Sequence, residues 1–157
     1  MDLNKAEELC RGLMSKHGLS YWEFRYDNSV RRFGVCRYTR YSELGVIGLS
    51  RKLVALNDED KVRDVILHEI AHALTKGHGH DSVWKAKCVE IGAKPERCYS
   101  SKDTNMSEMR YQAICGGCGI KHQKTKMKHK EAKRSCKCQS HKGWDEKILL
   151  NYIDTKK

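Results

Sequence analysis

The sequence predicts an α+β body over residues 1–100, followed by a small basic module over residues 101–157 that binds metal through cysteines. Three observations lead to this prediction. Apolar residues recur at helical spacing in three segments before residue 100. Short runs of aromatic and β-branched residues lie between the first two of these segments. After residue 109, paired cysteines and lysines replace the apolar periodicity. We therefore expect two domains.

The helices are predicted from apolar spacing and from their end signals. Asn57 is a good N-cap for the second helix, and the acidic side chains that follow it favour the positive end of the helix dipole. Glycines end the first and third helices. A short C-terminal helix is expected because Ile148, Leu149 and Tyr152 share one helical face. The expected helices span residues 3–14, 57–74, 82–91 and 145–152.

A small antiparallel sheet is predicted from three short runs. Residues 21–26 and 32–38 flank the polar turn Asp27-Asn28-Ser29, which indicates a hairpin, and residues 45–50 form a third strand. We expect residues 46–49 to lie at a sheet edge, where an extended peptide pairs by β-augmentation.

Composition excludes a membrane protein. The chain has 157 residues and eight cysteines, its mean hydropathy is −0.74, and it contains no long apolar run. The first residues lack the basic and apolar regions of a signal peptide. We expect a cytoplasmic monomer with no membrane association, whose cysteines are thiols or metal ligands rather than disulfides.

Two histidines one turn apart lie inside the second predicted helix. His68 and His72 occupy positions i and i+4, so both imidazoles can reach one Zn²⁺. Glu69 lies on the adjoining part of that face, where a carboxylate can accept a proton from water. Two surface histidines beside a solvated glutamate would give the same pattern, but this one falls in the middle of a well-capped helix. We predict a catalytic zinc site with Glu69 as general base.

A catalytic zinc ion needs a third protein ligand and an open fourth position. The segment Gly77-His78-Gly79-His80 follows the helix, and its glycines allow the chain to turn back toward it. Chemistry alone leaves both His78 and His80 open as the third ligand.

These segments resemble the SprT-like (Spartan-type) zinc metallopeptidases, and more closely their short bacterial and phage-type members. In that family the third ligand is a histidine followed four residues later by an aromatic residue, which here are His80 and Trp84. A strand of the form Ile-x-Leu-Ser precedes the active-site helix, as in Ile47-Gly48-Leu49-Ser50, and Ile91-Gly92-Ala93 matches the end of the next helix. The resemblance covers about residues 3–140. It implies a minimal zincin-like fold, with His80 as the third ligand.

Two cysteine pairs predict a second, structural zinc site. Cys115-Gly116-Gly117-Cys118 has the spacing of a zinc knuckle, because its glycines allow the tight turn that points both thiolates at one metal. We expect Cys136 and Cys138 to complete a four-thiolate zinc ribbon, which SprT-like proteins commonly carry after the protease domain. The second pair is Cys-x-Cys rather than Cys-x-x-Cys, so His141 is an alternative fourth ligand.

The charge of the chain is concentrated around these cysteines. Its net charge is +11, and residues 101–157 hold 14 basic against 6 acidic side chains. Such a block favours a polyanion partner, since cations release counterions from phosphates, although a solvated tail would have the same composition. The candidate nucleic-acid contacts are Lys121, Lys124, Lys126, Lys128, Lys130, Lys133 and Arg134.

The resemblance implies a DNA-associated zinc metalloprotease that cleaves proteins bound or crosslinked to DNA. The expected cofactors are two Zn²⁺ ions, one catalytic and one structural. The expected partners are DNA, bound with little sequence specificity, and protein substrates on that DNA. Two alternatives remain open. One is a non-catalytic nucleic-acid-binding adaptor or regulator in which both metals are structural, and the other is a site-specific peptidase that cleaves a repressor.

Overall fold

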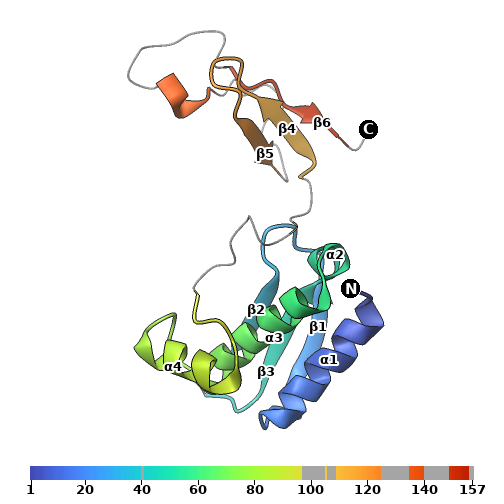
Figure 1. The fold of residues 1–157 in the computed structure, drawn as a ribbon, viewed down its shortest axis with the longest axis vertical. Helices are drawn as coiled ribbons and strands as arrows, with labels where there is room; N and C mark the ends of the chain where they lie inside the picture. The colour runs from blue at the N-terminus through green and yellow to red at the C-terminus, as the bar shows by residue number, and fades with distance from the viewer. Residues whose placement is uncertain (40, 97–104, 106–108, 125–134, 140–148, 156–157) are drawn as a thin grey trace. The chain divides into compact units, whose positions relative to one another are not determined.

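The computed structural model describes residues 1–39, 41–96, 105, 109–124, 135–139 and 149–155. The chain divides into two compact units, an N-terminal unit (Met1–Ser107) and a C-terminal unit (Glu108–Lys157). Figure 1 colours both along the chain. Each unit is described by itself below.

Helices of the N-terminal unit begin where side chains satisfy the first free amides. Asp58 Oδ1 accepts a hydrogen bond from the Lys61 amide at 2.9 Å, so Asp58 is the N-cap of the long helix instead of the expected Asn57. Asn57 ends an additional short helix that the sequence did not predict. Among the described residues, no helix is long and apolar enough to cross a membrane. The four helices are α1 (Leu3–Lys16), α2 (Arg51–Leu56), α3 (Glu59–Leu74) and α4 (Ser82–Ile91).

The sheet of this unit is mixed, and the predicted hairpin is wrong. Its strands are β1 (Glu23–Asp27), β2 (Gly34–Tyr38) and β3 (Gly45–Ser50), in the order β1-β3-β2. β3 pairs with β1 in parallel and with β2 in the antiparallel sense. Because β3 carries the most apolar run, with Ile47 and Leu49 fully buried, it takes the central position. The α+β class is as predicted, but the sheet is not wholly antiparallel.

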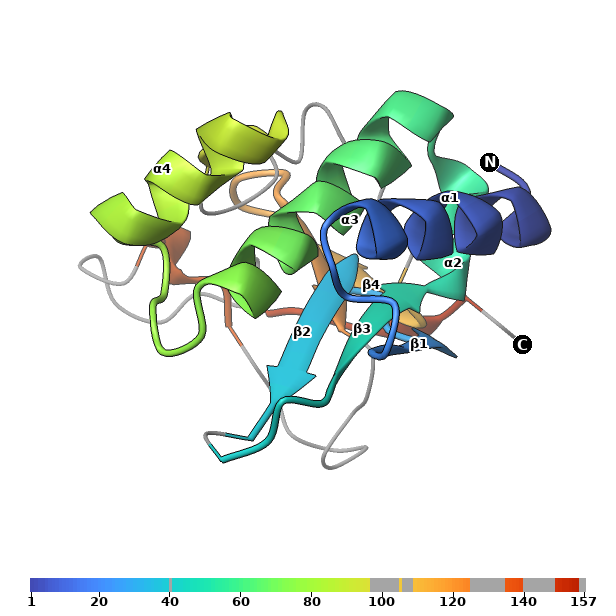
Figure 2. The same cartoon turned by 90° about the horizontal axis from the view of Figure 1, so that it is seen from below.

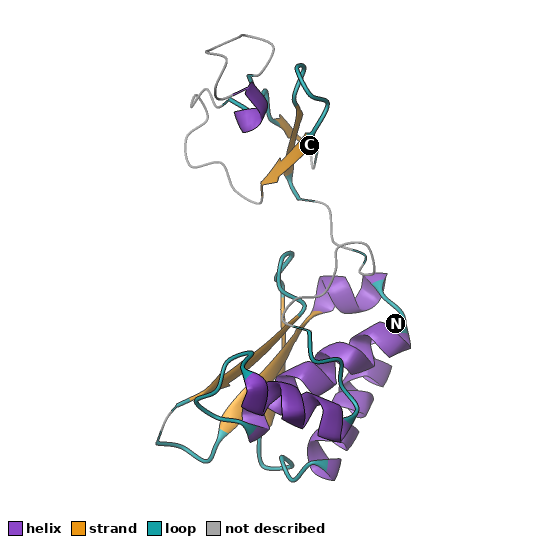
Figure 3. Ribbon diagram, turned by 60° about the vertical axis from the view of Figure 1, so that its left-hand side comes forward, coloured by secondary structure: helices purple, strands orange, loops and turns teal. Residues whose placement is uncertain are grey.

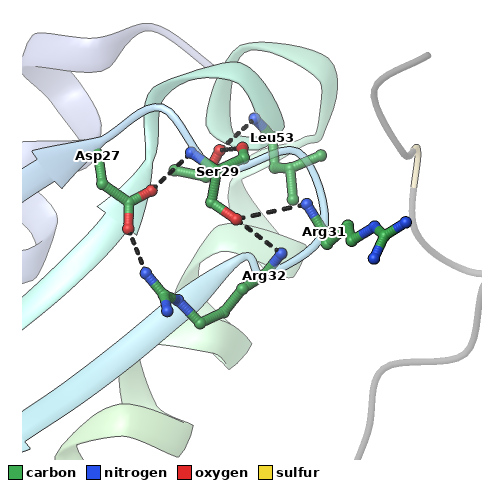
Figure 4. A network of polar contacts seen from close by, with 6 residues as sticks. Asp27, Ser29, Arg31, Arg32 and Leu53 are labelled. Carbon is green, nitrogen blue, oxygen red and sulfur yellow. Dashed lines mark hydrogen bonds and ion pairs between the residues drawn. The ribbon is translucent and has the colours of Figure 1, made fainter. Parts of the chain in front are cut away.

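A polar network shapes the loop that separates β1 from β2 (Figure 4). Asp27 accepts a hydrogen bond from the Ser29 amide at 2.9 Å, and Ser29 Oγ accepts one from the Arg32 amide at 3.0 Å. Asp27 also forms an ion pair with the Arg32 guanidinium. The Ser50 hydroxyl donates to the Ser29 carbonyl at 2.6 Å, which ties this loop to the end of β3. The loop is thus wide enough for β3 to lie between the two strands.

The helices cover one face of the sheet. Figures 2 and 3 show α1, α3 and α4 on the same side of the three strands. Phe24, Ile47 and Leu49 point into the core between these layers. Because side chains alternate along a strand, Glu23, Val46 and Arg37, which are paired across the sheet, point to the opposite face.

The C-terminal unit contains a second three-stranded sheet. Its strands are β4 (Tyr111–Ile114), β5 (Lys121–Lys124) and β6 (Ile153–Asp154), in the order β5-β4-β6. A 3-10 turn, η1, spans Lys137–Gln139. Its small core consists of Ala113, Cys115, Cys136 and Leu150.

The expected C-terminal helix is wrong where the structure describes it. Residues 145–148 lie outside the described residues, but Leu149 forms a β-bridge with Ser135 and β6 begins at Ile153. Residues 153–154 pair with Tyr111 and Gln112 of β4, and the Arg110 guanidinium forms an ion pair with Asp154, with Nη2 at 2.7 Å from Oδ2. This contact holds β6 beside β4.

Candidate active site

Three histidine side chains converge at the C-terminal half of α3. His68 and His72 lie one turn apart on this helix, and His80 comes from the turn that leads to α4. The Nε2 atoms of His72 and His80 lie 3.2 Å apart, and those of His80 and His68 lie 3.3 Å apart. The ring atoms of all three residues therefore point at one place.

This arrangement fits a zinc ion. Imidazole nitrogens around a tetrahedral Zn²⁺ at about 2.0–2.1 Å are separated by about 3.3 Å, which is the spacing found here. Burial, followed by the neighbouring histidines, lowers the pKa of His68 to about 3. Burial, followed by His80, lowers the pKa of His72 to about 4. Both rings are thus neutral at neutral pH, the form in which imidazole binds a metal.

The structure separates the two candidates for the third ligand. His78 is exposed and lies outside the cluster, with its Nδ1 at 2.9 Å from Asp81 Oδ2. The other carboxylate oxygen of Asp81 accepts the Trp84 amide at 3.0 Å and caps α4. His78 therefore contacts the cap of the next helix, while His80 joins His68 and His72.

Trp84 forms the wall behind the three rings. It is fully buried in the first turn of α4. Its ring centroid lies 4.8 Å from that of His68, 5.1 Å from that of His72 and 4.6 Å from that of His80. Trp84 thus packs α4 against α3 and also restricts the orientation of each imidazole.

Glu69 is buried beside these histidines, with 7% of its surface exposed. Burial raises the pKa of Glu69 to about 8, while the charge of Arg32 and a hydrogen bond from the Cys36 backbone oppose this rise. Arg32 is the residue that Asp27 and Ser29 hold in the β1–β2 loop (Figure 4). The carboxyl group is therefore desolvated, yet next to groups that favour its charged form.

The strand beside Glu69 is β2, and this corrects the expected substrate edge. Residues 46–49 belong to β3, which is paired on both sides and cannot accept a further strand. β2 lies at the border of the sheet and, among the described residues, pairs with β3 alone. Gly34 on β2 lies directly against the Glu69 side chain. The open edge of β2 thus runs beside the Glu69 carboxylate.

A sequence model of the SprT-like family matches residues 14–107, a span that holds all three histidines and Glu69. The chain belongs to the SprT-like family. No curated protein matches this SprT-like chain significantly. Among solved structures it is similar to "Crystal structure of the metallopeptidase zymogen of Pyrococcus abyssi abylysin", with 20% sequence identity and a TM-score of 0.41 over 55% of this chain and 77% of that chain. Membership of the SprT-like family supports metallopeptidase activity.

The C-terminal unit of the SprT-like chain brings four thiols together. Cys115 Sγ lies 3.7 Å from Cys138 Sγ, and Cys118 Sγ lies 3.7 Å from Cys136 Sγ. Sulfur atoms around a tetrahedral Zn²⁺ at about 2.3 Å are separated by about 3.8 Å, so this donor set fits zinc. The alternative ligand His141 lies outside the described residues.

His122 is a neighbour of this cluster that sequence reasoning missed. Its Nε2 lies 3.2 Å from Cys136 Sγ, because β5 runs alongside the cysteine cluster. A ring N–H that donates to a metal-bound thiolate would orient that ligand. The position of His122, four residues after Cys118, was the available signal.

Two of the seven candidate nucleic-acid contacts are described. Lys121 and Lys124 lie at the ends of β5. The Lys124 ammonium lies 4.1 Å from the centre of the Tyr152 ring, an aromatic neighbour that the sequence did not predict. The remaining candidates, Lys126, Lys128, Lys130, Lys133 and Arg134, lie outside the described residues.

Proposed function

We propose that this chain is a DNA-associated zinc metalloendopeptidase that cleaves proteins bound or crosslinked to DNA, acting in the cytoplasm. The observation that carries the peptidase part is the convergence of three imidazoles next to a buried glutamate. A purely structural zinc site has no use for a buried carboxylate between two of its ligands, so Glu69 favours the enzyme over the adaptor.

Different residues of the chain would bind the metal, transfer the proton and align the peptide. His68, His72 and His80 would hold the zinc ion, which when bound supplies a Lewis acid for the scissile carbonyl and for water. Glu69 in its ionised form, which the neighbouring charge of Arg32 favours, would accept a proton from water and return it to the leaving amine. The open edge of β2 offers main-chain hydrogen bonds to an extended peptide and so aligns it along α3.

The C-terminal unit supports the DNA part of the proposal through charge and shape. A cavity of about 440 Å³ on this unit is lined by Ile120, His122, Lys124, Lys137 and Tyr152, together with Cys136 and Cys138 of the cysteine cluster. Cations beside an aromatic ring suit an unpaired nucleotide, whose phosphate and base each find a partner. The basic surplus of residues 101–157 favours the same ligand.

The test uses the zinc-loaded full-length chain and a DNA-binding protein as substrate, with and without DNA, followed by gel analysis for fragments. We expect fragments, more of them when DNA is present, and none from Glu69→Gln. Absence of fragments under both conditions would favour the adaptor. Equal cleavage with and without DNA would remove the DNA part alone. Cleavage restricted to one site in a single repressor would favour the site-specific peptidase.

A further inference from the structure

A cavity of about 420 Å³ lies at one end of the N-terminal sheet. It is formed where β2 ends and where β1 and β3 begin, under the loop that joins β2 to β3. Its lining residues are Tyr21, Glu23, Arg37, Tyr38, Thr39, Ser42, Leu44, Gly45 and Val46. We propose that this cavity is a substrate subsite that takes one large apolar side chain of the polypeptide being cleaved. The inference rests on the proposed peptidase function and names a determinant of its specificity.

The cavity and Glu69 lie at opposite ends of the same strand, β2. Gly34, at the start of β2, lies against Glu69, while Arg37 and Tyr38, at its end, line the cavity. At about 3.3 Å per residue, the four steps from Gly34 to Tyr38 span about 13 Å. A peptide paired with the open edge of β2 therefore reaches the cavity two to four residues from the bond beside Glu69.

A peptide paired with β2 would also direct side chains to the face of the sheet that carries the cavity. Glu23, Val46 and Arg37 are paired across the strands and point away from α3. In a peptide that extends the sheet, every second side chain points to that same face. Antiparallel pairing, the more stable kind, would place the selected residue on the amino side of the cleaved bond.

The chemistry of the lining selects an apolar, uncharged side chain. Tyr21 and Leu44 are 51% and 60% exposed, unusually open for residues of their size. Val46 lines the cavity between Glu23 and Arg37, which are its partners in the sheet register. The Glu23 carboxylate is already paired with Arg25. An apolar side chain that covers Tyr21, Leu44 and Val46 would remove their surface from water, which is favourable.

Two contacts fix the walls of the cavity to the active-site helix. The Lys76 ammonium donates to the carbonyls of Ser42 at 3.0 Å and Glu43 at 3.2 Å. The Gly77 amide donates to the Tyr38 hydroxyl at 2.9 Å. Residues 76–77 follow α3 directly and lead to His80. The subsite is therefore held at a fixed distance from the zinc ligands, as a specificity pocket must be.

The experiment measures cleavage of a peptide library that varies each position around the cut bond, using wild type, Leu44→Ser and Leu56→Ser. Leu56 is the matched control, because it is a 46% exposed leucine on α2 that does not line the cavity. We expect a preference for Leu, Met or Phe at one position two to four residues from the cut. Leu44→Ser should weaken it roughly tenfold through KM with kcat unchanged, and Leu56→Ser should preserve it.

Binding provides a second readout that does not depend on turnover. A fluorescent peptide with Phe at that position, and its Ser counterpart, are titrated into Glu69→Gln carrying the same leucine changes. Tighter binding of the Phe peptide, abolished by Leu44→Ser alone, would support the subsite. Equal binding of both peptides, or a cleavage profile that Leu44→Ser leaves unchanged, would overturn it. Failure of wild type to cut any peptide would instead count against the peptidase function, with the binding result still deciding the subsite.

Discussion

Gly34 and Glu69 are in such close contact that a Cβ atom at Gly34 would lie 2.6 Å from Glu69 Oε1 and 2.8 Å from its Cγ. The same atom would lie 2.8 Å from Val65 Cγ1, so a side chain at position 34 would press on two residues of α3. Gly34 does not have a positive φ, and its backbone would accept other residues. Glycine is therefore required here for space, and it gives the Glu69 carboxyl its position beside β2.

We predict that Gly34→Ala lowers kcat by about 10²-fold, because the added methyl group displaces the proton acceptor from its working position. Zinc content should stay that of wild type, since the three histidines are not touched. Steady-state kinetics on a short peptide and metal analysis measure the two quantities.

Gly48→Ala is the matched control for this change. Its Cβ would lie 2.8 Å from Val35 Cγ1, on the face of the sheet that points away from α3 and Glu69. Gly48→Ala thus reports the effect of a methyl group added to the same sheet without contact to Glu69. Equal activity of the two variants would show that Gly34 has no special role in placing Glu69.

A second prediction concerns the third zinc ligand. His80→Ala should reduce zinc content strongly, because it removes one of three convergent nitrogens. His78→Ala should leave zinc bound and lose only an exposed contact with Asp81. Metal analysis after gel filtration distinguishes the two variants. Loss of zinc from His78→Ala together with retention by His80→Ala would reverse the assignment.

A third prediction concerns Cys36, a thiol on β2 near Glu69. Burial, followed by the charge of Glu69, raises the pKa of Cys36 to about 12. The reactive thiolate is then a very small fraction of the thiol at pH 8. We expect brief treatment with iodoacetamide to leave peptide cleavage intact, whereas a chelator abolishes it. Cys36→Ala should keep most of the activity. Rapid inactivation by iodoacetamide, absent from Cys36→Ala, would contradict the buried, protonated thiol.

Features that depend on residues close together in the sequence are predicted correctly, whereas features that depend on contacts between distant segments are not. α4 ends at Gly92 as predicted, because its capping residues lie within the helix's own neighbourhood in sequence. His68 and His72 share a helix face for the same reason. Strand pairing joins distant segments, so the local pattern predicts a hairpin for the runs that form β1 and β2, although β3 lies between them. Turn residues at 27–29 gave a local preference that tertiary pairing overrode.

The residue roles that the sequence does not predict all depend on contacts with residues distant in the chain. The role of Gly34 depends on the packing of β2 against α3, and the spacing of apolar residues in the sequence does not predict that packing. The local pattern predicts a helix at Tyr152, whereas its position beside Lys124 depends on the pairing of β5 and on the segment before β6. His80 could be chosen over His78 by resemblance, but the reason, that His78 contacts Asp81, is a matter of three-dimensional geometry.

A fourth prediction concerns the number of metal ions. Two separate donor sets, three imidazoles and four thiols, imply two zinc ions per chain. Cys115→Ser with Cys118→Ser should remove one ion and destabilise the C-terminal unit, because that small core has little else to hold it. Cleavage of a short peptide should persist. A single zinc ion in wild type, unchanged by the double substitution, would eliminate the cysteine site.

The last prediction tests whether the lysines of β5 contact DNA. If the basic C-terminal unit meets four to six phosphates, the logarithm of affinity falls with the logarithm of salt concentration with a slope of about −3 to −5. Lys121→Gln with Lys124→Gln should flatten this slope by up to about two units, equally for different DNA sequences. Lys16→Gln with Lys85→Gln removes the same charge from exposed positions of the N-terminal unit and should leave the slope unchanged. Equal slopes for the two double variants would make Lys121 and Lys124 a solvated face with no part in binding.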